Sequence, residues 1–303
     1  PDFPPRIDER DLRDKKLQDK LRSVLISQGL NEVITFSLLN YKILGILKYP
    51  DEEARFILNP LNSEQRLLRP TLLAGLLDVI RINLNRKQEK VLIFEQGRRF
   101  TKATEETMLA FAVCGEDIKC LPQGRHKEEY SIFHIKGILE ELFFAAGIGK
   151  YEFNAKTTLY FSEGSSFVVN LGDSELGVFG EIRPEILEAF DIKNKRVFAA
   201  EMQMEKIYQF FCLSRQYRPL PVYPAIKRDI SLILKQDITA EQVKDVIIRN
   251  AGHNLKDVSV IDCYYGRQIP EGFKGIVFSC LYRSDDHTLK DTCLLYTSDA
   301  ADE

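Results

Sequence analysis

The chain has 303 residues, 44% of them hydrophobic, and a formal net charge of −3 at pH 7. This length can supply two domains, each with its own core. The charge argues against a simple basic nucleic-acid binder, and no apolar run approaches the roughly 20 residues that span a bilayer. The six cysteines form no CxxC pair and the four histidines show no paired metal-ligand spacing, so we expect a cytoplasmic protein without a metal site.

The two ends of the sequence predict a fragment. The first ten residues, PDFPPRIDER, contain neither an initiator Met nor a signal sequence. The last eleven, CLLYTSDAADE, have no periodicity that joins them to the preceding chain, and they match one reading frame of a transposase-type sequencing adapter. We therefore expect residues 293–303 to be an adapter-derived tail, with an ordinary acidic terminus as the alternative.

The first predicted elements are a helix, a strand and a second helix. Apolar residues share one face of the helix predicted at residues 17–29, and the β-branched and aromatic residues of 32–39 predict a strand. Residues 42–55 are expected to connect this strand to a helix at 70–86, with Pro70 in its first turn. The apolar stripe of this second helix consists of Leu72, Leu73, Leu76, Leu77, Ile80 and Leu84.

The middle of the chain predicts several strands around one long helix. Ser131 is expected to cap that helix and Gly147 to end it, whereas Pro184 opens a short helix further on. Strands are predicted at residues 91–100, 107–114, 166–171, 175–182 and 197–204. Because most strands are joined by turns, a largely antiparallel sheet that carries helices fits better than a doubly wound parallel sheet.

A second domain is predicted after the proline-interrupted segment 212–223. A strand at 229–234 precedes a helix with a capping box of Thr239 and Gln242, and strands at 258–264 and 275–283 follow. This β-α-β-β order is three quarters of a ferredoxin-like split βαβ unit. Because the fourth strand of that unit pairs beside the first, we expect an unpaired edge on the first strand, low stability and weak RNA binding.

Ordered motifs across residues 1–291 carry a family resemblance. Six segments carry it, in chain order: NPLNSEQRLLRPTLLAGLLDVIRINLNRK, VLIFEQGRRF, FHIKGILEELFFAAGI, LGVFGEIRPEILEAFDI, YPAIKRDISLIL and VIDCYYGRQIPEGFKGIVFSCLYRSDDHTLKD. Together they resemble the bacterial phenylalanyl-tRNA synthetase β-subunit family. The resemblance implies an α+β chain with two domains. A class II synthetase-like antiparallel sheet with helices, without catalysis of its own, would occupy residues 1–214. A truncated ferredoxin-fold anticodon-binding domain would occupy residues 215–292.

The same resemblance implies partners and cofactors. The holoenzyme would be a heterotetramer of two α and two β subunits that uses ATP and Mg to attach phenylalanine to tRNA(Phe), with the chemistry on the α subunit. This chain would bind no cofactor and no membrane. Two alternatives stay open: a stand-alone RNA-binding or interaction protein built from the same domains, and a self-sufficient synthetase.

Three arginines are candidates for holding ATP phosphates, because activation with ATP needs fixed cations. Arg98 and Arg99 end the strand at 91–100 but are followed by Thr101, without the Arg-acidic pair of the catalytic relatives. Arg183 lies in the run GVFGEIRP, which has two glycines where the catalytic pattern has three. We therefore expect a pseudo-catalytic domain, with solvated or interface arginines.

Two sets of residues are candidates for macromolecular contacts. The polar flank of the helix at 70–86 is expected to meet the α subunit, and the candidate tRNA contacts are cations near the predicted strand ends, each with a solvated surface charge as the alternative. The flank consists of Arg81, Asn83, Asn85 and Arg86. The cations are Lys227, Arg228, Arg267, Lys274 and Arg283. Tyr264 and Tyr265 could stack on an exposed base or serve in packing.

Other polar clusters predict no chemistry. Glu140 and Glu141 are adjacent on a helix and cannot both face one substrate. His134 has no identifiable nucleophile beside it and is expected to cap or pack. The run Asp285-Asp286-His287 is expected to form a polar turn rather than a metal site.

Overall fold

The computed structural model describes residues 9–60, 64–121, 124–211, 220–265 and 269–289. The chain divides into two compact units, Pro1–Arg215 and Gln216–Glu303. Each unit has its own apolar core, as the hydrophobic patterns predict.

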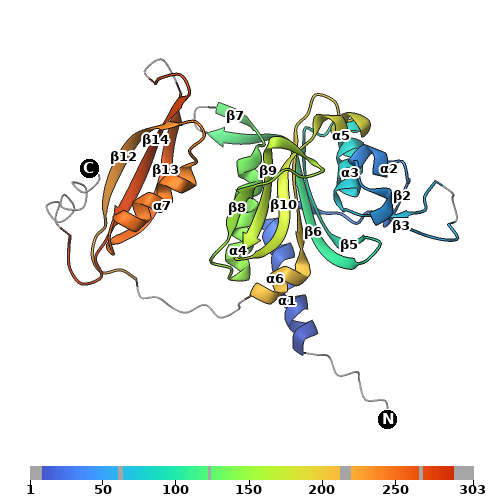
Figure 1. Cartoon of the computed structure of the whole chain (residues 1–303), viewed down its shortest axis with the longest axis horizontal. Coiled ribbons are helices and arrows are strands. Elements are labelled where there is room, and N and C mark those ends of the chain that lie inside the picture. Colours follow the sequence, from blue (N-terminus) through green and yellow to red (C-terminus); the bar gives the residue numbers. More distant parts are fainter. Residues whose placement is uncertain (1–8, 61–63, 122–123, 212–219, 266–268, 290–303) are drawn as a thin grey trace, which may run out of the picture. The chain divides into compact units, whose positions relative to one another are not determined.

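An eight-stranded sheet forms the centre of the first unit (Figure 1). Its strand order is β1-β5-β6-β11-β10-β9-β8, and β7 pairs with β6. The described pairings are antiparallel except for β1 with β5. The strands are β1 (Asn31–Glu32), β5 (Lys90–Phe100), β6 (Glu105–Leu121), β7 (Gly124–Glu129), β8 (Glu152–Ala155), β9 (Phe161–Leu171), β10 (Ser174–Ile182) and β11 (Val197–Gln203). The largely antiparallel sheet predicted from the sequence is confirmed.

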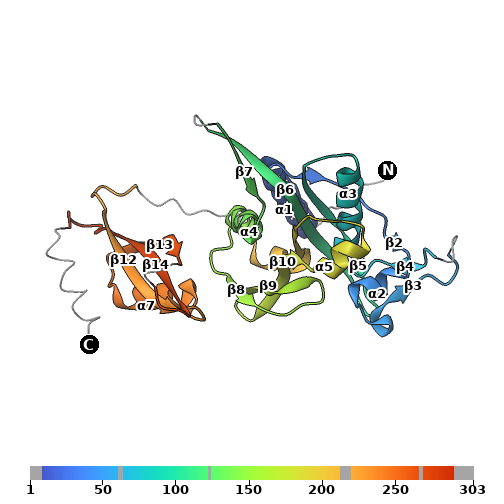
Figure 2. The ribbon, with the colours of Figure 1, turned by 90° about the horizontal axis from the view of Figure 1, so that it is seen from above.

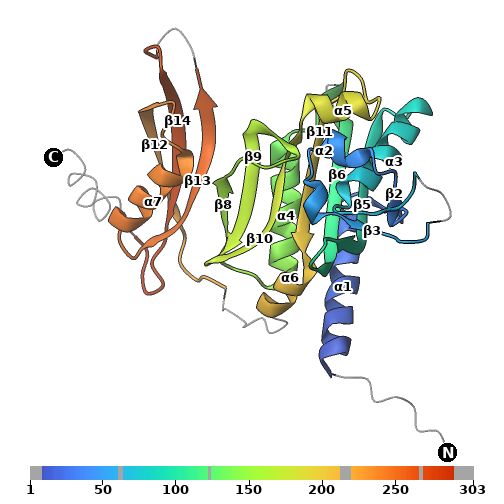
Figure 3. The same ribbon diagram turned by 45° about the vertical axis from the view of Figure 1, so that its right-hand side comes forward.

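Helices cover both faces of this sheet. On one face α1 packs beside α4, and the cluster around Phe94 and Phe111 lies beneath them (Figure 3). On the other face α3 and α5 cover the small side chains of Ala110, Ala112 and Ala199. The helices are α1 (Glu9–Ser27), α2 (Ile43–Leu47), α3 (Leu73–Asn85), α4 (Ile132–Ala146), α5 (Pro184–Ala189) and α6 (Met204–Phe210), with a 3-10 turn η1 (Asp51–Glu53).

A small three-stranded sheet lies with α2 at one end of the unit (Figure 2). It contains β2 (Leu38–Leu39), β4 (Leu67–Leu68) and β3 (Arg55–Phe56), in that order. The segment 42–55, predicted as a plain connection, therefore contains a short helix, a 3-10 turn and the start of a strand. Its elements are too short for a periodic pattern to reveal them.

The strand predicted at residues 32–39 is wrong, because only its two ends pair with other strands. In between, the N–H and the hydroxyl of Thr35 donate hydrogen bonds to Glu95 at 3.2 and 2.7 Å. Gly75 lets the segment approach α3 closely, since a Cβ there would lie 2.2 Å from the Thr35 hydroxyl oxygen. A buried carboxylate thus replaces strand pairing at this point.

The predicted helix ends are mostly confirmed. Gly29 and Gly147 take left-handed conformations, with φ of 85° and 73°, just after α1 and α4. The Ser131 N–H donates to Nδ1 of His134 at 3.1 Å, so this histidine caps α4 as expected. Pro184 opens α5 as predicted, but Pro70 precedes α3 by three residues and does not lie in its first turn.

The second unit has the predicted β-α-β-β order. Its sheet has the order β12-β14-β13, and α7 begins with the predicted capping box, in which Thr239 and Gln242 exchange hydrogen bonds of 2.9 and 3.2 Å. Among the described residues β12 pairs only with β14, so it is an edge strand there. The elements are β12 (Ile226–Lys235), α7 (Ala240–Asn250), β13 (Leu255–Tyr264) and β14 (Phe273–Tyr282).

Candidate functional site

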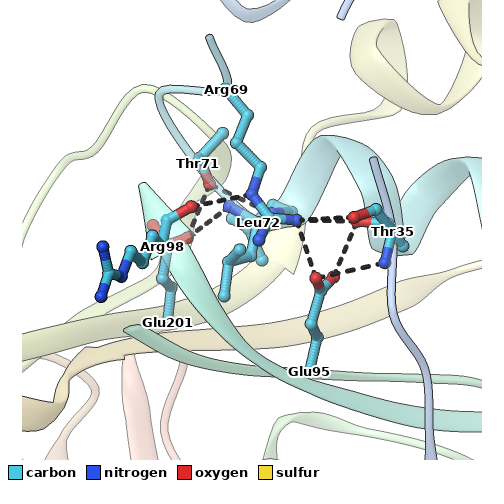
Figure 4. Close-up of polar contacts among 8 residues, drawn as sticks. Thr35, Arg69, Thr71, Leu72, Glu95, Arg98 and Glu201 are labelled. Carbon is cyan, nitrogen blue, oxygen red and sulfur yellow. Dashed lines mark hydrogen bonds and ion pairs between the residues drawn. The ribbon is translucent and has the colours of Figure 1, made fainter. Parts of the chain in front are cut away.

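A buried ion pair joins the α3 side of the sheet to the segment before α3 (Figure 4). The guanidinium of Arg69 lies 2.7 Å from Oε1 of Glu95, and the side chains are 4% and 2% exposed. Arg69 also donates to Thr35 Oγ1 at 2.9 Å and to the Arg98 carbonyl at 2.8 Å. A Cβ at Gly97 would lie 2.3 Å from Nη2 of Arg69, so glycine makes room for this side chain. The pair is therefore fully surrounded by protein.

A second buried carboxylate, Glu201 on β11, lies on the same face (Figure 4). Its Oε1 accepts hydrogen bonds from the Thr71 hydroxyl at 2.9 Å and from the Leu72 N–H at 2.7 Å, where α3 begins. Arg99 lies 3.9 Å from its Oε2 and 2.6 Å from Glu106. The N-terminal end of a helix favours negative charge, so Glu201 ties β11 to α3.

Burial raises the pKa of Glu201, and Arg99, the Leu72 N–H and the Thr71 hydroxyl offset only part of this effect. With a folded-state pKa above the unfolded value, the contribution of Glu201 to stability is greatest below the unfolded pKa and is lost as the pH rises through the folded pKa. Glu201→Gln removes this titration. We expect the free energy of unfolding of the native chain, minus that of the variant, to fall as the pH rises from acid to neutral. Urea unfolding across pH measures it, and a difference that grows with pH would contradict the assignment.

The three arginines considered for ATP already bind partners within the chain. Arg98 pairs with Glu105, and Arg99 pairs with Glu106. Arg183 donates to two backbone carbonyls, those of Phe161 and Thr158, at 2.9 and 2.6 Å. The turn between β5 and β6 is only four residues long and is closed by hydrogen bonds between Thr101 and Thr104. The strand pairings place Arg183, which follows β10, at the opposite end of the sheet from Arg98 and Arg99, so the three guanidinium groups do not form one cation site.

The polar flank of α3 is only partly available for contacts. Arg81 pairs with Asp78 at 2.6 Å, and Asn83 donates to the Val79 carbonyl at 2.9 Å. Asn85 and Arg86 are exposed. The predicted leucine stripe is buried as expected, apart from the half-buried Leu84.

Large apolar side chains are more exposed in the segments that precede β2 and follow β3. Ile34, Phe36 and Leu58 are 92%, 88% and 96% exposed. Nearby, the guanidinium of Arg66 lies over the rings of Tyr41 and Phe56 at 5.3 and 5.2 Å. Ile34 and Phe36 lie two residues apart in one segment, and neighbouring exposed apolar side chains are typical of a protein interface. Ile34 and Phe36 belong to the segment 32–39, which was predicted as a strand, whereas Leu58 lies outside every predicted element.

The cations proposed for tRNA lie on the second unit, with Arg267 outside the described residues. Lys227 and Arg228 are exposed near the start of β12. Lys274, at the start of β14, donates to the Gln236 carbonyl at 2.9 Å. The backbone N–H of Arg283 donates to the Asn254 carbonyl at 2.8 Å, just after β14 ends. Pairing of β12 with β14 sets Lys227 opposite Leu281 and Lys274 opposite Leu234, so these two lysines lie near opposite ends of the two strands.

Tyr264 lies on the face of the sheet opposite α7. Its ring covers Gly275 on the central strand, since a Cβ there would meet Cζ of the ring at 2.4 Å. Its hydroxyl lies 3.1 Å from the Ser231 hydroxyl on β12. The side chain remains partly exposed, and Tyr265 is more exposed still. A ring lying on a sheet with one face open to solvent can stack on a base.

The remaining clusters behave as structural groups. Within the described residues no group of His, Cys, Asp and Glu has the geometry to hold a metal. Glu140 and Glu141 are exposed on α4. The Asp286 N–H donates to the Ser284 hydroxyl, which also contacts Nδ1 of His287, so the predicted polar turn is confirmed.

Comparison with known protein families gives two matches that together cover most of the chain. Residues 4–204 match the phenylalanyl-tRNA synthetase β chain CLM domain, and residues 221–296 match the ferredoxin-fold anticodon-binding domain. The first match alone covers more than half of the chain. The chain belongs to the phenylalanyl-tRNA synthetase β-chain family.

Relatives of this β chain are β subunits of phenylalanine–tRNA ligase. Those from Halalkalibacterium halodurans and Carboxydothermus hydrogenoformans are 35% and 33% identical over 283 and 282 residues, in each case 90% of this chain and 35% of the relative. The chain thus spans about a third of the length of these curated relatives. Among solved structures, a pyrrolysyl-tRNA synthetase from Desulfitobacterium hafniense superposes with a TM-score of 0.51 at 22% identity, covering 64% of each chain. That likeness supports the class II synthetase-like fold expected for the first unit.

Proposed function

We propose that this chain is the non-catalytic C-terminal part of a β subunit of phenylalanine–tRNA ligase. The holoenzyme would attach phenylalanine to tRNA(Phe) with ATP and Mg, with the chemistry on the α subunit and no cofactor bound by this chain. One observation carries the non-catalytic role: Arg98, Arg99 and Arg183 are all committed to partners within the chain. Such a protein would work in the cytoplasm. No described helix is long and apolar enough to cross a bilayer.

The domain roles follow the two compact units. Residues 1–214 would form the class II synthetase-like domain that supports assembly, and residues 215–292 the truncated anticodon-binding domain. Residues 293–303 would be the adapter-derived tail. The family matches to 4–204 and 221–296 support the division between the two domains.

The α subunit is the proposed partner of the first unit, in a heterotetramer of two α and two β subunits. The exposed side chains of Ile34, Phe36 and Leu58 support a protein interface there, because so much apolar surface in water is costly. Co-purification of a tagged α subunit from the same genome with this chain tests the proposal. Retention of the chain is expected, and its absence would contradict the role in assembly.

The exposed end of α3 gives a sharper test of the proposed interface. We expect Arg86→Glu to weaken co-purification about tenfold and to leave the melting temperature unchanged, since Arg86 is exposed. Lys87→Glu makes the same charge change at the adjacent exposed residue and should have a smaller effect. Equal retention of Arg86→Glu and native chains would exclude Arg86 from the interface.

The second unit is proposed to bind the anticodon stem of tRNA. Its sequence from 215 to 291 holds twelve Lys or Arg and ten Asp or Glu, so any affinity depends on where the cations lie rather than on net charge. Lys227, Arg228, Arg267, Lys274 and Arg283 are the proposed phosphate contacts. Tyr264 is the proposed stacking platform, on the strength of its position over Gly275.

A further inference from the structure

The outer face of α4 contains a glycine that the packing of this chain does not require. Gly137 lies within the 15-residue helix, where glycine costs about 1 kcal/mol relative to alanine. A Cβ at this position would meet no atom of the described chain within 4 Å. Because glycine is favoured where another backbone approaches closely, its presence here points to a contact outside the chain.

Two aromatic side chains flank this glycine on the same face. Phe133 and Phe144 are 75% and 61% exposed, whereas the opposite side of α4 is buried against the sheet. Eleven residues separate them, close to three full helical turns, so they lie in one line about 16 Å apart along the axis. Gly137 lies between them.

One positive and one negative side chain lie on one side of this line. Lys136 and Glu140 form an ion pair at 3.9 Å one turn apart, and the Lys136 ammonium lies 5.4 Å from the centre of the Phe153 ring. Glu141 lies on the other side of the line, because each residue turns the helix by about 100°. The line of Phe133, Gly137 and Phe144, with this ion pair beside it, is called the α4 outer face.

We propose that the α4 outer face docks on the same face of a second copy of this chain, with the two helices antiparallel about a two-fold axis. Such a contact requires a self-complementary surface. With the axis between Ile138 and Leu139, Phe133 lies level with Phe144 of the second copy. Gly137 lies near the axis and lets the backbones approach.

The charges fit this arrangement as well. A two-fold axis across two antiparallel helices brings the same side of each helix together. Lys136 then lies beside Glu140 of the second copy, and the reciprocal pair forms at the other end of the contact. The four charges alternate in sign, so no like charges face each other.

The contact is expected to be weak. One pair of helices of this length buries less surface than the roughly 1,200 Å² of a stable interface. We expect the monomer and dimer to exchange in a concentration-dependent way. This inference does not depend on binding of an α subunit or of tRNA.

Sedimentation equilibrium of the 303-residue chain at up to about 1 mM tests the contact. We expect the native chain to dimerise and Glu140→Lys to weaken dimerisation at least about tenfold, since the new lysine faces Lys136 of the second copy. The charge swap Lys136→Glu with Glu140→Lys should restore dimerisation. Glu141→Lys makes the same charge change on the other side of the line and should shift it less than about twofold.

Three results would overturn the proposal: a chain that stays monomeric throughout, equal effects of Glu140→Lys and Glu141→Lys, or a charge swap that fails to restore dimerisation. The melting temperature of each variant shows whether α4 still folds. Gly137→Leu is an independent test, because it keeps every charge and blocks only the close approach of the two α4 backbones. Undiminished dimerisation of that variant would also contradict the arrangement.

Discussion

Arg69→Ala is expected to lower the free energy of unfolding of the first unit by about 3–5 kcal/mol. The substitution leaves Glu95 buried without its cation, and a buried unpaired carboxylate is strongly destabilising. It also removes the donors to Thr35 and to the Arg98 carbonyl, which join three segments. Urea unfolding followed by circular dichroism measures the loss.

Arg81→Ala is the matched control for this experiment. Arg81 also pairs with a carboxylate, that of Asp78, but both side chains are solvent-accessible. An exposed pair contributes less than about 1 kcal/mol, so the control should unfold almost as the native chain does. Replacing both members of the buried pair, with Arg69→Met and Glu95→Leu, should cost less than Arg69→Ala alone. Equal losses for Arg69→Ala and Arg81→Ala would refute the role given to the buried pair.

Tyr264→Ala is expected to weaken tRNA binding by about 5-fold to 150-fold, the effect of losing one base stacked on an aromatic ring. The ring lies flat on Gly275 and is open to solvent on its outer side, so its loss removes the platform without opening the core. Binding of tRNA(Phe) at low salt, followed by fluorescence anisotropy, measures the change.

Tyr264→Phe separates stacking from hydrogen bonding. It keeps the ring and removes only the contact with Ser231, so affinity should change less than about threefold. Lys227→Ala should instead weaken binding in a salt-dependent way and lower the slope of log affinity against log salt by about 1. Native affinity in Tyr264→Ala would exclude the stacking role.

Local patterns predicted the elements whose boundaries are set by their own residues. The capping box at Thr239, the αL glycines after α1 and α4, and Pro184 at the start of α5 all involve neighbours within a few residues. The strand predicted at 32–39 failed because Thr35 bonds to Glu95, sixty residues away. Short elements such as α2 and the strands of the small sheet have too few residues for a period to emerge.

The buried charge network could not be predicted from local sequence patterns, because its partners are far apart in the sequence. Arg69 and Glu95 are 26 residues apart, and Thr71 and Glu201 are 130 apart. A signal did exist, since Glu95 directly follows the apolar run 91–94 and Glu201 lies in the largely apolar strand 197–203, and a charge there must find a partner. The exposed apolar surface at Ile34 and Phe36 had no such signal, because alternating apolar residues also suit a half-buried strand.

This chain is proposed to have no catalysis of its own. Charging of tRNA(Phe) with radiolabelled phenylalanine and ATP, measured with the chain alone, tests it most directly. Circular dichroism of the same sample establishes that the chain is folded. We expect no charging above the background without protein, because Arg98, Arg99 and Arg183 are each bound to partners within the chain. Turnover by the folded chain without an α subunit would contradict it.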